Sequence, residues 1–212
     1  MITVVGSLKG GSGKSTVTFN LAVWLSMAGQ DVLAVDVDPQ ATLSDVAEVR
    51  AEEGYTPKIK VKGKSALRLE DMQDADEVLI DIGTADIDSM KKAIELADRI
   101  VVPVPPSQAD IWSSQRFIRF VQSVRGNDNM PKLMGFINRA DTHKAVRESD
   151  EAAAALVSLP GIDFLKPRLC QRTVFRRSFS EGLAVFELDP RSKGTREWNS
   201  LVALLYPHLV SG

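Results

Sequence analysis

Short apolar runs alternate with amphipathic segments along the whole chain. The runs consist mostly of β-branched and aliphatic residues and are nearly free of charge, which is typical of strands buried on both faces of a sheet. They predict strands over residues 2–6, 32–36, 78–82, 100–104 and 133–137. Helical spacing of apolar residues predicts helices over residues 15–28, 88–97, 111–124 and 146–157. This alternation predicts an α/β fold, a doubly wound and mostly parallel sheet with helices on both faces.

Two further segments have patterns of their own. Residues 58–64 alternate lysine with mostly apolar residues, which favours an edge strand guarded by its lysines; a contact with cargo or DNA is the alternative. Residues 196–209 have helical apolar spacing and lack a lysine-rich face. We therefore interpret them as a closing helix packed on the core, with a membrane-targeting tail as the alternative.

Composition narrows the class of protein. A chain of 212 residues with 44% hydrophobic content is long enough for one well-buried core, so we expect a single domain over residues 1–212. The formal net charge of -2 means that any nucleic-acid binding has to come from a local basic patch. The lone Cys170 supports neither a disulfide framework nor a zinc site. With no signal peptide and no apolar run long enough to cross a bilayer, the sequence predicts a cytoplasmic protein.

A glycine-rich stretch, Lys-Gly-Gly-Ser-Gly-Lys-Ser at residues 9–15, lies between the first predicted strand and the first predicted helix. That is the context of a P-loop, in which backbone N–H groups and a helix N-terminus point at one phosphate. We expect Lys14 to reach the β and γ phosphates of ATP and Ser15 to offer its hydroxyl to Mg2+. The predicted nucleotide-binding residues in this stretch are Lys9, Gly10, Gly11, Ser12, Gly13, Lys14, Ser15 and Thr16.

Acidic residues follow two of the predicted strands. Asp36 and Asp38 lie in the sequence Asp-Val-Asp-Pro-Gln at the end of the second strand, and Asp81 lies at the end of an apolar run. Carboxyl ends of parallel strands converge on the crevice where ligands bind, so Asp81 is expected to hold Mg2+ through water. Each of the three aspartates could instead cap a helix.

The P-loop departs from the general pattern in an informative way, because Leu8 stands where the first glycine would be and Lys9 follows it. The stretch thereby resembles the deviant Walker A motif, K-G-G-x-x-K-[ST], of the ParA/MinD family. The resemblance covers essentially the whole chain and is closest to small plasmid-partition ParA and ParF-type proteins. It implies that Lys9 reaches the partner's nucleotide in a dimer, that Asp38 orients the attacking water, and that Asp36 lies near the metal. The implied catalytic residues are Lys9, Lys14 and Asp38, and the metal site is Ser15, Asp36 and Asp81.

Two more segments carry family features. The loop Pro-Val-Pro-Pro-Ser at residues 103–107 resembles the family's loop that precedes an aspartate near the dimer face, here Asp110. Asn138 and Arg139, directly after the fifth predicted strand, resemble the family's adenine-facing asparagine and its neighbour. A plain turn at the strand end is the alternative.

The densest basic cluster is a candidate DNA patch, and its members are Arg168, Arg172, Arg176 and Arg177. Phosphate neutralisation alone would give nonspecific, salt-sensitive binding. A solvated surface with intramolecular ion pairs is the alternative. The resemblance adds that small ParA-like proteins bind DNA nonspecifically when they dimerise with ATP.

These observations together predict an ATPase with ATP and Mg2+ as cofactors. By resemblance, it forms a homodimer with ATP sandwiched between the subunits, binds nonspecific DNA on the nucleoid, and is stimulated by a ParB-like or other adaptor, without a membrane role. We expect it to partition plasmid or chromosomal DNA. The alternatives are positioning of a protein cargo such as a carboxysome or chemoreceptor cluster, a MinD-like membrane ATPase, and a metabolic ligase or reductase.

Overall fold

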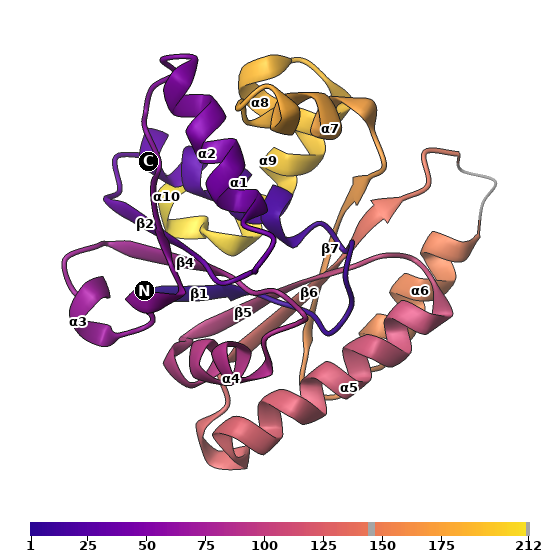
Figure 1. The fold of residues 1–212 in the computed structure, drawn as a ribbon. Helices are drawn as coiled ribbons and strands as arrows, with labels where there is room; N and C mark the ends of the chain where they lie inside the picture. Colours follow the sequence, from indigo (N-terminus) through magenta and orange to yellow (C-terminus); the bar gives the residue numbers. More distant parts are fainter. Residues whose placement is uncertain (144–146, 211–212) are drawn as a thin grey trace.

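The computed structural model describes residues 1–143 and 147–210 and contains one seven-stranded sheet (Figure 1). All six strand pairings are parallel, and the order across the sheet is β3-β2-β4-β1-β5-β6-β7. The strands are β1 (Ile2–Val5), β2 (Val32–Asp36), β3 (Lys60–Gly63), β4 (Glu77–Asp81), β5 (Arg99–Val104), β6 (Lys132–Ala140) and β7 (Asp163–Cys170). The central β1 carries the P-loop at its carboxyl end, so the loop opens at the middle of one sheet edge.

Helices cover both faces of the sheet (Figure 1). One face is packed by α1 (Lys14–Met27), α2 (Thr42–Glu52), α7 (Thr173–Ser180), α8 (Val185–Leu188) and α9 (Lys193–Leu205). The other face is packed by α3 (Leu69–Met72), α4 (Ile87–Leu96), α5 (Gln108–Arg125) and α6 (Glu148–Val157). A short α10 (Pro207–Val210) follows α9. Strands such as β2 and β5 are buried along their whole length because apolar helix faces lie on both sides of them.

The sequence-based predictions agree with the core of this fold. Each of the five predicted strands overlaps an observed one, and the four predicted helices correspond to α1, α4, α5 and α6. The fourth predicted helix, which corresponds to α6, was expected to begin at Val146, a residue outside the described part of the chain. The sheet is wholly parallel, where a mostly parallel sheet was expected. The strand β7 and the helices α2 and α7 were not predicted.

The two segments with unusual patterns also have clear places. The lysine-rich segment forms β3 at one edge of the sheet, which confirms the edge-strand interpretation. Its lysines are ion-paired on the surface, for example Lys60 with Asp31 at 2.7 Å. The predicted closing helix is α9, and its apolar residues Trp198 and Leu201 are fully buried against the sheet. None of the helices in the described part of the chain is long and apolar enough to span a membrane.

A buried ion pair joins α2 to the C-terminal part of the chain. The Arg50 side chain is completely buried and donates hydrogen bonds to both carboxylate oxygens of Glu187, each at 2.8 Å. It also donates to the carbonyl oxygens of Pro57 and Gly182, at 2.8 and 3.0 Å. Every polar contact of this guanidinium is therefore made within the protein, which makes the pair costly to break from one side.

We predict that Arg50→Met lowers the free energy of unfolding by about 3–5 kcal/mol, because it leaves the Glu187 carboxylate without its charged partner and two carbonyls without their donor. Urea unfolding of the nucleotide-free protein measures the change. The matched control is Arg177→Met, which removes an exposed ion pair with Glu181 and should cost less than about 1 kcal/mol. Equal small losses in both variants would contradict the assignment.

Candidate nucleotide-binding site

A cavity of about 700 Å³ opens at the carboxyl edge of the sheet beside the P-loop. Its walls come from the P-loop, the segment after β2, the loop after β4, the end of β6 and α7. The lining includes most of the residues predicted from sequence, namely Gly10, Gly11, Gly13, Lys14, Ser15, Thr16, Asp38, Asn138, Arg139, Arg172 and Arg176. Ser12, Asp36 and Asp81 are buried and are not among the lining residues. The size is ordinary for a pocket that holds a small ligand.

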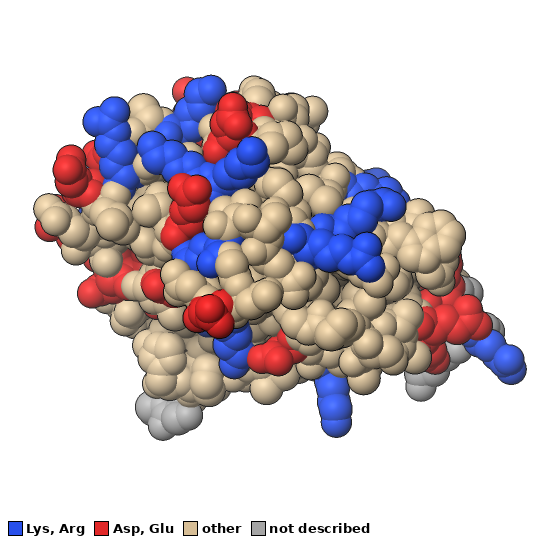
Figure 2. Space-filling model, turned by 90° about the horizontal axis from the view of Figure 1, so that it is seen from below, with Lys and Arg blue, Asp and Glu red and all other residues tan. Residues whose placement is uncertain are grey.

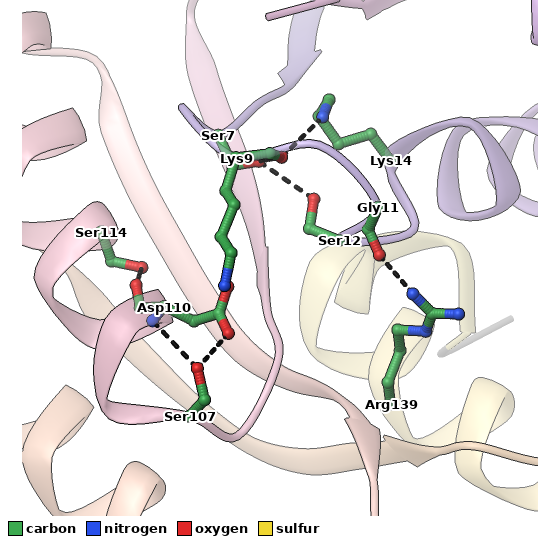
Figure 3. A network of polar contacts seen from close by, with 9 residues as sticks. All are labelled: Ser7, Lys9, Gly11, Ser12, Lys14, Ser107, Asp110, Ser114 and Arg139. Carbon is green, nitrogen blue, oxygen red and sulfur yellow. Dashed lines mark hydrogen bonds and ion pairs between the residues drawn. The ribbon is translucent and has the colours of Figure 1, made fainter.

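The P-loop has the backbone shape that an anion site requires. Gly11 and Gly13 have φ of 74° and 91°, in the left-handed region where a side chain would be strained. The Gly13 carbonyl accepts the first hydrogen bond of α1, from Val17 N–H at 3.0 Å, so the loop leads directly into a helix N-terminus. The Lys14 ammonium bends back across the loop and donates to the Lys9 carbonyl at 3.2 Å (Figure 3). Burial lowers the pKa of Lys14, while the nearby carboxylates of Asp81 and Asp38 raise it.

Asp81 is a buried carboxylate without a hydrogen-bond partner in the described part of the chain. It is 1% exposed, and neither carboxylate oxygen has a hydrogen-bond partner among the described residues. Burial raises its pKa to about 7, against smaller opposing effects of Ser15 and Lys14. The Ser15 hydroxyl lies near enough to lower this pKa, although no hydrogen bond of normal geometry joins the two side chains. Mg2+ is held in proteins by oxygen atoms, usually from one or two carboxylates together with the phosphates of a nucleotide. The unpaired carboxylate of Asp81 and the nearby hydroxyl of Ser15 therefore fit this metal.

Asp36 and Asp38 do different work although they are two residues apart. Asp36 Oδ2 accepts hydrogen bonds from Ser44 N–H and Ser44 Oγ–H at 2.8 and 2.9 Å, in the first turn of α2. The N-cap residue, Ala41, has no side chain that could accept a hydrogen bond from the first turn of α2. Asp36 supplies that acceptor instead and thereby caps the helix, which was the alternative left open for it. Asp38 lines the cavity and accepts from Gln40 N–H at 3.0 Å. Of the two, only Asp38 is among the cavity-lining residues.

The Lys9 side chain points away from its own P-loop. Its ammonium pairs with Asp110 Oδ1 at 2.9 Å, at the start of α5 (Figure 3). The Asp110 carboxylate is 6% exposed and also accepts a short hydrogen bond from Ser107, whereas the Lys9 side chain is 48% exposed. The loop of residues 103–107 therefore does lead to an aspartate beside Lys9, and the lysine lies at the surface rather than in the cavity.

Two residues at the end of β6 donate hydrogen bonds to the P-loop. Asn138 Nδ2 donates to the Ser12 carbonyl at 2.6 Å, and Arg139 Nη1 donates to the Gly11 carbonyl at 2.5 Å. Both residues also line the cavity. Sequence reasoning predicted their presence at the site but expected them to face adenine rather than to bind the loop.

The candidate DNA patch is largely engaged in ion pairs within the chain. Arg168 pairs with Asp150 at 2.6 Å, Arg172 with Glu197 at 2.6 Å and Arg177 with Glu181 at 3.4 Å. Arg176 is exposed and lines the cavity. Figure 2 shows the opposite face, over α4 and α5, where acidic side chains and a group of Lys and Arg side chains lie in a surface that is mostly uncharged. The arginines stay a predicted DNA contact, one that has to compete with carboxylates already in place.

Sequence reasoning missed two parts of the site. Helix α7 contributes Phe175, Phe179 and Ser180 to the cavity wall, whereas the sequence analysis considered only the arginines of this segment, as a DNA contact. Ser44 holds Asp36 and was not considered. Helix α7 directly follows β7, whose sequence mixes apolar and polar residues. Because β7 was not recognised as a strand, α7 was not predicted as the helix that follows it. No group of three or more His, Cys, Asp or Glu side chains that could hold a metal occurs within residues 1–143 and 147–210.

Comparison with known proteins gives a consistent result. A family model described as the CobQ/CobB/MinD/ParA nucleotide binding domain matches residues 3–185. "Maintenance of carboxysome distribution protein A" of Halothiobacillus neapolitanus is 26% identical over 198 residues, which cover 91% of this chain and 90% of that protein. "Protein ParA" of Rhizobium radiobacter is 25% identical over 186 residues, covering 85% and 83%. The structure of a putative plasmid partition protein from Borrelia burgdorferi bound to AMPPNP superposes with a TM-score of 0.75 at 18% identity and covers 98% of both chains.

We predict that Asp81→Asn stabilises the nucleotide-free protein at pH 8, by up to roughly 4 kcal/mol at about 1.4 kcal/mol per pKa unit. Because the folded-state pKa of about 7 lies above the ordinary aspartate pKa of 3.8, the folded state binds the proton more tightly than the unfolded state does. Wild-type stability therefore falls as pH rises from 4 to 7, and the gain from the variant shrinks toward pH 4. Thermal unfolding at pH 4.5 and pH 8 measures it.

The matched control is Asp71→Asn, which changes a carboxylate that is 38% exposed and pairs with Lys62 at 3.8 Å. It should change the melting temperature little at either pH. If Asp81→Asn lowered the stability at pH 8, Asp81 would have a partner that compensates its charge.

Proposed function

This chain belongs to the CobQ/CobB/MinD/ParA nucleotide-binding family, and we propose that it hydrolyses ATP and uses an ATP-bound dimer to position a large cargo on DNA. Its fold, the matching family model and its similarity to a ParA protein identify it as a ParA-like P-loop ATPase. The single observation that supports ATP as the ligand best is a P-loop whose Lys14 lines a cavity and lies close enough to the buried carboxylate of Asp81 for each group to shift the pKa of the other.

The chemistry follows from where the charges lie. Lys14 at the cavity wall would neutralise the β and γ phosphates. Burial lowers the pKa of its ammonium, and the carboxylates of Asp81 and Asp38 oppose that shift because they favour the charged form. Ser15 and Asp81 would hold Mg2+, which supplies further positive charge to the phosphates when it is bound. Asp38 lines the cavity and would orient an attacking water. Catalysis would rest on positioning and charge stabilisation rather than on a strong general base.

Dimerisation would give Lys9 its role. Its side chain is half exposed and lies at the surface beside the nucleotide cavity, so the ammonium could reach a second subunit once it leaves Asp110. An additional cation at the β–γ bridge of the partner's ATP would neutralise charge on the leaving group, as an arginine finger does. The position of Lys9 outside its own cavity supports action in trans.

Two cargoes are supported by different observations. Plasmid or chromosomal DNA is supported by the similarity to Protein ParA of Rhizobium radiobacter. A protein cargo is supported by the similarity to the carboxysome distribution protein, which extends over 91% of this chain. In this proposal both functions would use the same ATP-dependent, nonspecific DNA binding. The genes that neighbour this one would therefore separate them: a centromere-binding protein against a microcompartment operon.

The central prediction is that the protein binds nonspecific duplex DNA with ATP but not with ADP or without nucleotide, and that binding weakens steeply with salt. Fluorescence anisotropy over a series of salt concentrations measures it. We expect the exposed pair Arg176→Ala/Arg177→Ala to weaken binding and to reduce the salt slope by about two, one for each lost phosphate contact. The matched control is Lys92→Ala, an exposed cation on α4, which should leave binding unchanged.

The outcomes are distinct. Binding that is independent of nucleotide would disconnect DNA from the ATP switch. No binding with any nucleotide would remove the DNA-based function and leave a membrane or metabolic ATPase, which liposome flotation with ATP would separate. An unchanged salt slope in the double variant would place the DNA contact elsewhere on the molecule.

We further predict that Lys14→Ala weakens ATP binding itself, whereas Lys9→Ala keeps ATP binding and loses the hydrolysis that a partner protein stimulates. The reason is that Lys14 lines the cavity while Lys9 lies outside it. Equilibrium ATP binding and steady-state hydrolysis distinguish the two effects. Equal loss of ATP binding in both variants would count against a trans role for Lys9.

A further inference from the structure

The end of β6 ties down two consecutive carbonyls of the P-loop. Asn138 Nδ2 donates to the Ser12 carbonyl at 2.6 Å, and Arg139 Nη1 donates to the Gly11 carbonyl at 2.5 Å (Figure 3 shows the arginine contact). The donors lie 126 and 128 residues after their acceptors, so the fold brings these groups together. Two adjacent peptide units of the loop are therefore oriented by one strand end.

The orientation of these carbonyls fixes the orientation of the N–H groups in the same peptide units. In a trans peptide the C=O and N–H bonds point in opposite directions. The carbonyls of Gly11 and Ser12 share their peptide units with the N–H groups of Ser12 and Gly13, which consequently point away from β6. No acceptor for either N–H group occurs among the described residues. Consecutive backbone N–H groups without an internal partner are the donors that an anion site needs.

The strand is distorted in a way that makes both contacts possible. Successive side chains of a regular strand point to opposite faces, so neighbours such as Asn138 and Arg139 would not both reach the same loop. The pairing of β6 with β7 shifts register between Phe136 and Asn138 and again between Asn138 and Ala140. Arg139 itself has a φ of 56°, in the left-handed region that non-glycine residues rarely adopt. Irregularities of this kind re-aim side chains and are concentrated at functional sites.

The contact is also tight. A Cβ added to Gly13 would lie 2.4 Å from Asn138 Nδ2, closer than two such atoms can approach. Asn138 is 8% exposed, so its amide is held in place by its surroundings. The P-loop glycine and the asparagine are therefore fitted to each other.

We propose that Asn138 and Arg139 are positioning residues that hold the P-loop peptides in the phosphate-binding orientation. They act through the loop and not through the base. This inference rests on the proposed function, because it concerns how the same site binds the phosphates of its nucleotide. The competing role, recognition of adenine by the Asn138 amide, predicts a loss confined to adenine nucleotides.

The test compares three ligands that share a triphosphate and differ in the base: ATP, GTP and inorganic tripolyphosphate, each with Mg2+. Isothermal titration calorimetry measures the affinity of the full chain for each ligand. We expect Asn138→Ala and Arg139→Ala to weaken whichever of these ligands the wild type binds by about the same factor, roughly tenfold for one hydrogen bond. The matched controls are Asn127→Ala and Arg119→Ala, exposed residues of the same types, which should bind like the wild type.

Two more variants separate the donor from the backbone. Arg139→Lys retains a cationic donor and should recover most of the affinity for tripolyphosphate. Arg139→Gly accepts the left-handed backbone without strain but has no donor, so it should lose affinity as Arg139→Ala does. Circular dichroism and thermal unfolding show whether each variant is folded, and the exposed Arg139 keeps the test decisive if Asn138→Ala does not fold.

Three results would overturn the proposal. If Asn138→Ala weakened ATP binding but left tripolyphosphate binding unchanged, the amide would recognise the base. If both alanine variants bound all three ligands like the wild type, the contacts would not orient the loop. If the wild type bound neither nucleotide nor tripolyphosphate, the proposed ATPase function would fail first, which distinguishes that failure from the other two.

Discussion

The close approach of Gly13 to Asn138 is the constraint on which the site depends. There is no room for a side chain between them, since a Cβ on Gly13 would lie 2.4 Å from the amide nitrogen. The approach requires that the P-loop after β1 and the end of β6 be separated only by the single strand β5. Sheet order, strand length and loop conformation are thus fixed together, and a change in any of them would move the N–H groups of the P-loop.

The site also contains buried charged groups that destabilise the folded state in the absence of a ligand. Asp81 is dehydrated and lacks a hydrogen-bond partner within the described residues, and the neighbouring Lys14 is itself partly dehydrated. Elsewhere a buried charge such as Arg50 is fully paired. A stable fold would normally avoid an orphaned carboxylate, so its presence marks a place where ligand binding rather than folding selects the residue. The same reasoning applies to the left-handed backbone of Arg139.

The sequence allowed the central strands and the P-loop to be predicted because their signals are local. Strands β1, β2, β4 and β5 are continuous apolar runs, and the glycines and lysines of the loop are adjacent. Strand β7 was missed because its sequence, Asp-Phe-Leu-Lys-Pro-Arg-Leu-Cys, mixes charges and proline into an edge position. The contacts of Asn138 and Arg139 depend on strand order and on a bulge, which no local pattern reveals. Nor does local sequence show that Glu197 pairs with Arg172.

The pair of Lys9 and Asp110 bears on how a dimer would form. In the single chain the lysine has a carboxylate partner at 2.9 Å, so in the proposed dimer it would exchange Asp110 for the partner's phosphates. That exchange costs little on the side of the lysine, because its side chain is 48% exposed to water. It is costlier for Asp110, which is almost buried but keeps the hydroxyl of Ser107 as a donor. The hydroxyl of Ser107 thus makes release of Lys9 compatible with a stable α5 N-terminus, since the carboxylate is never left without a hydrogen bond.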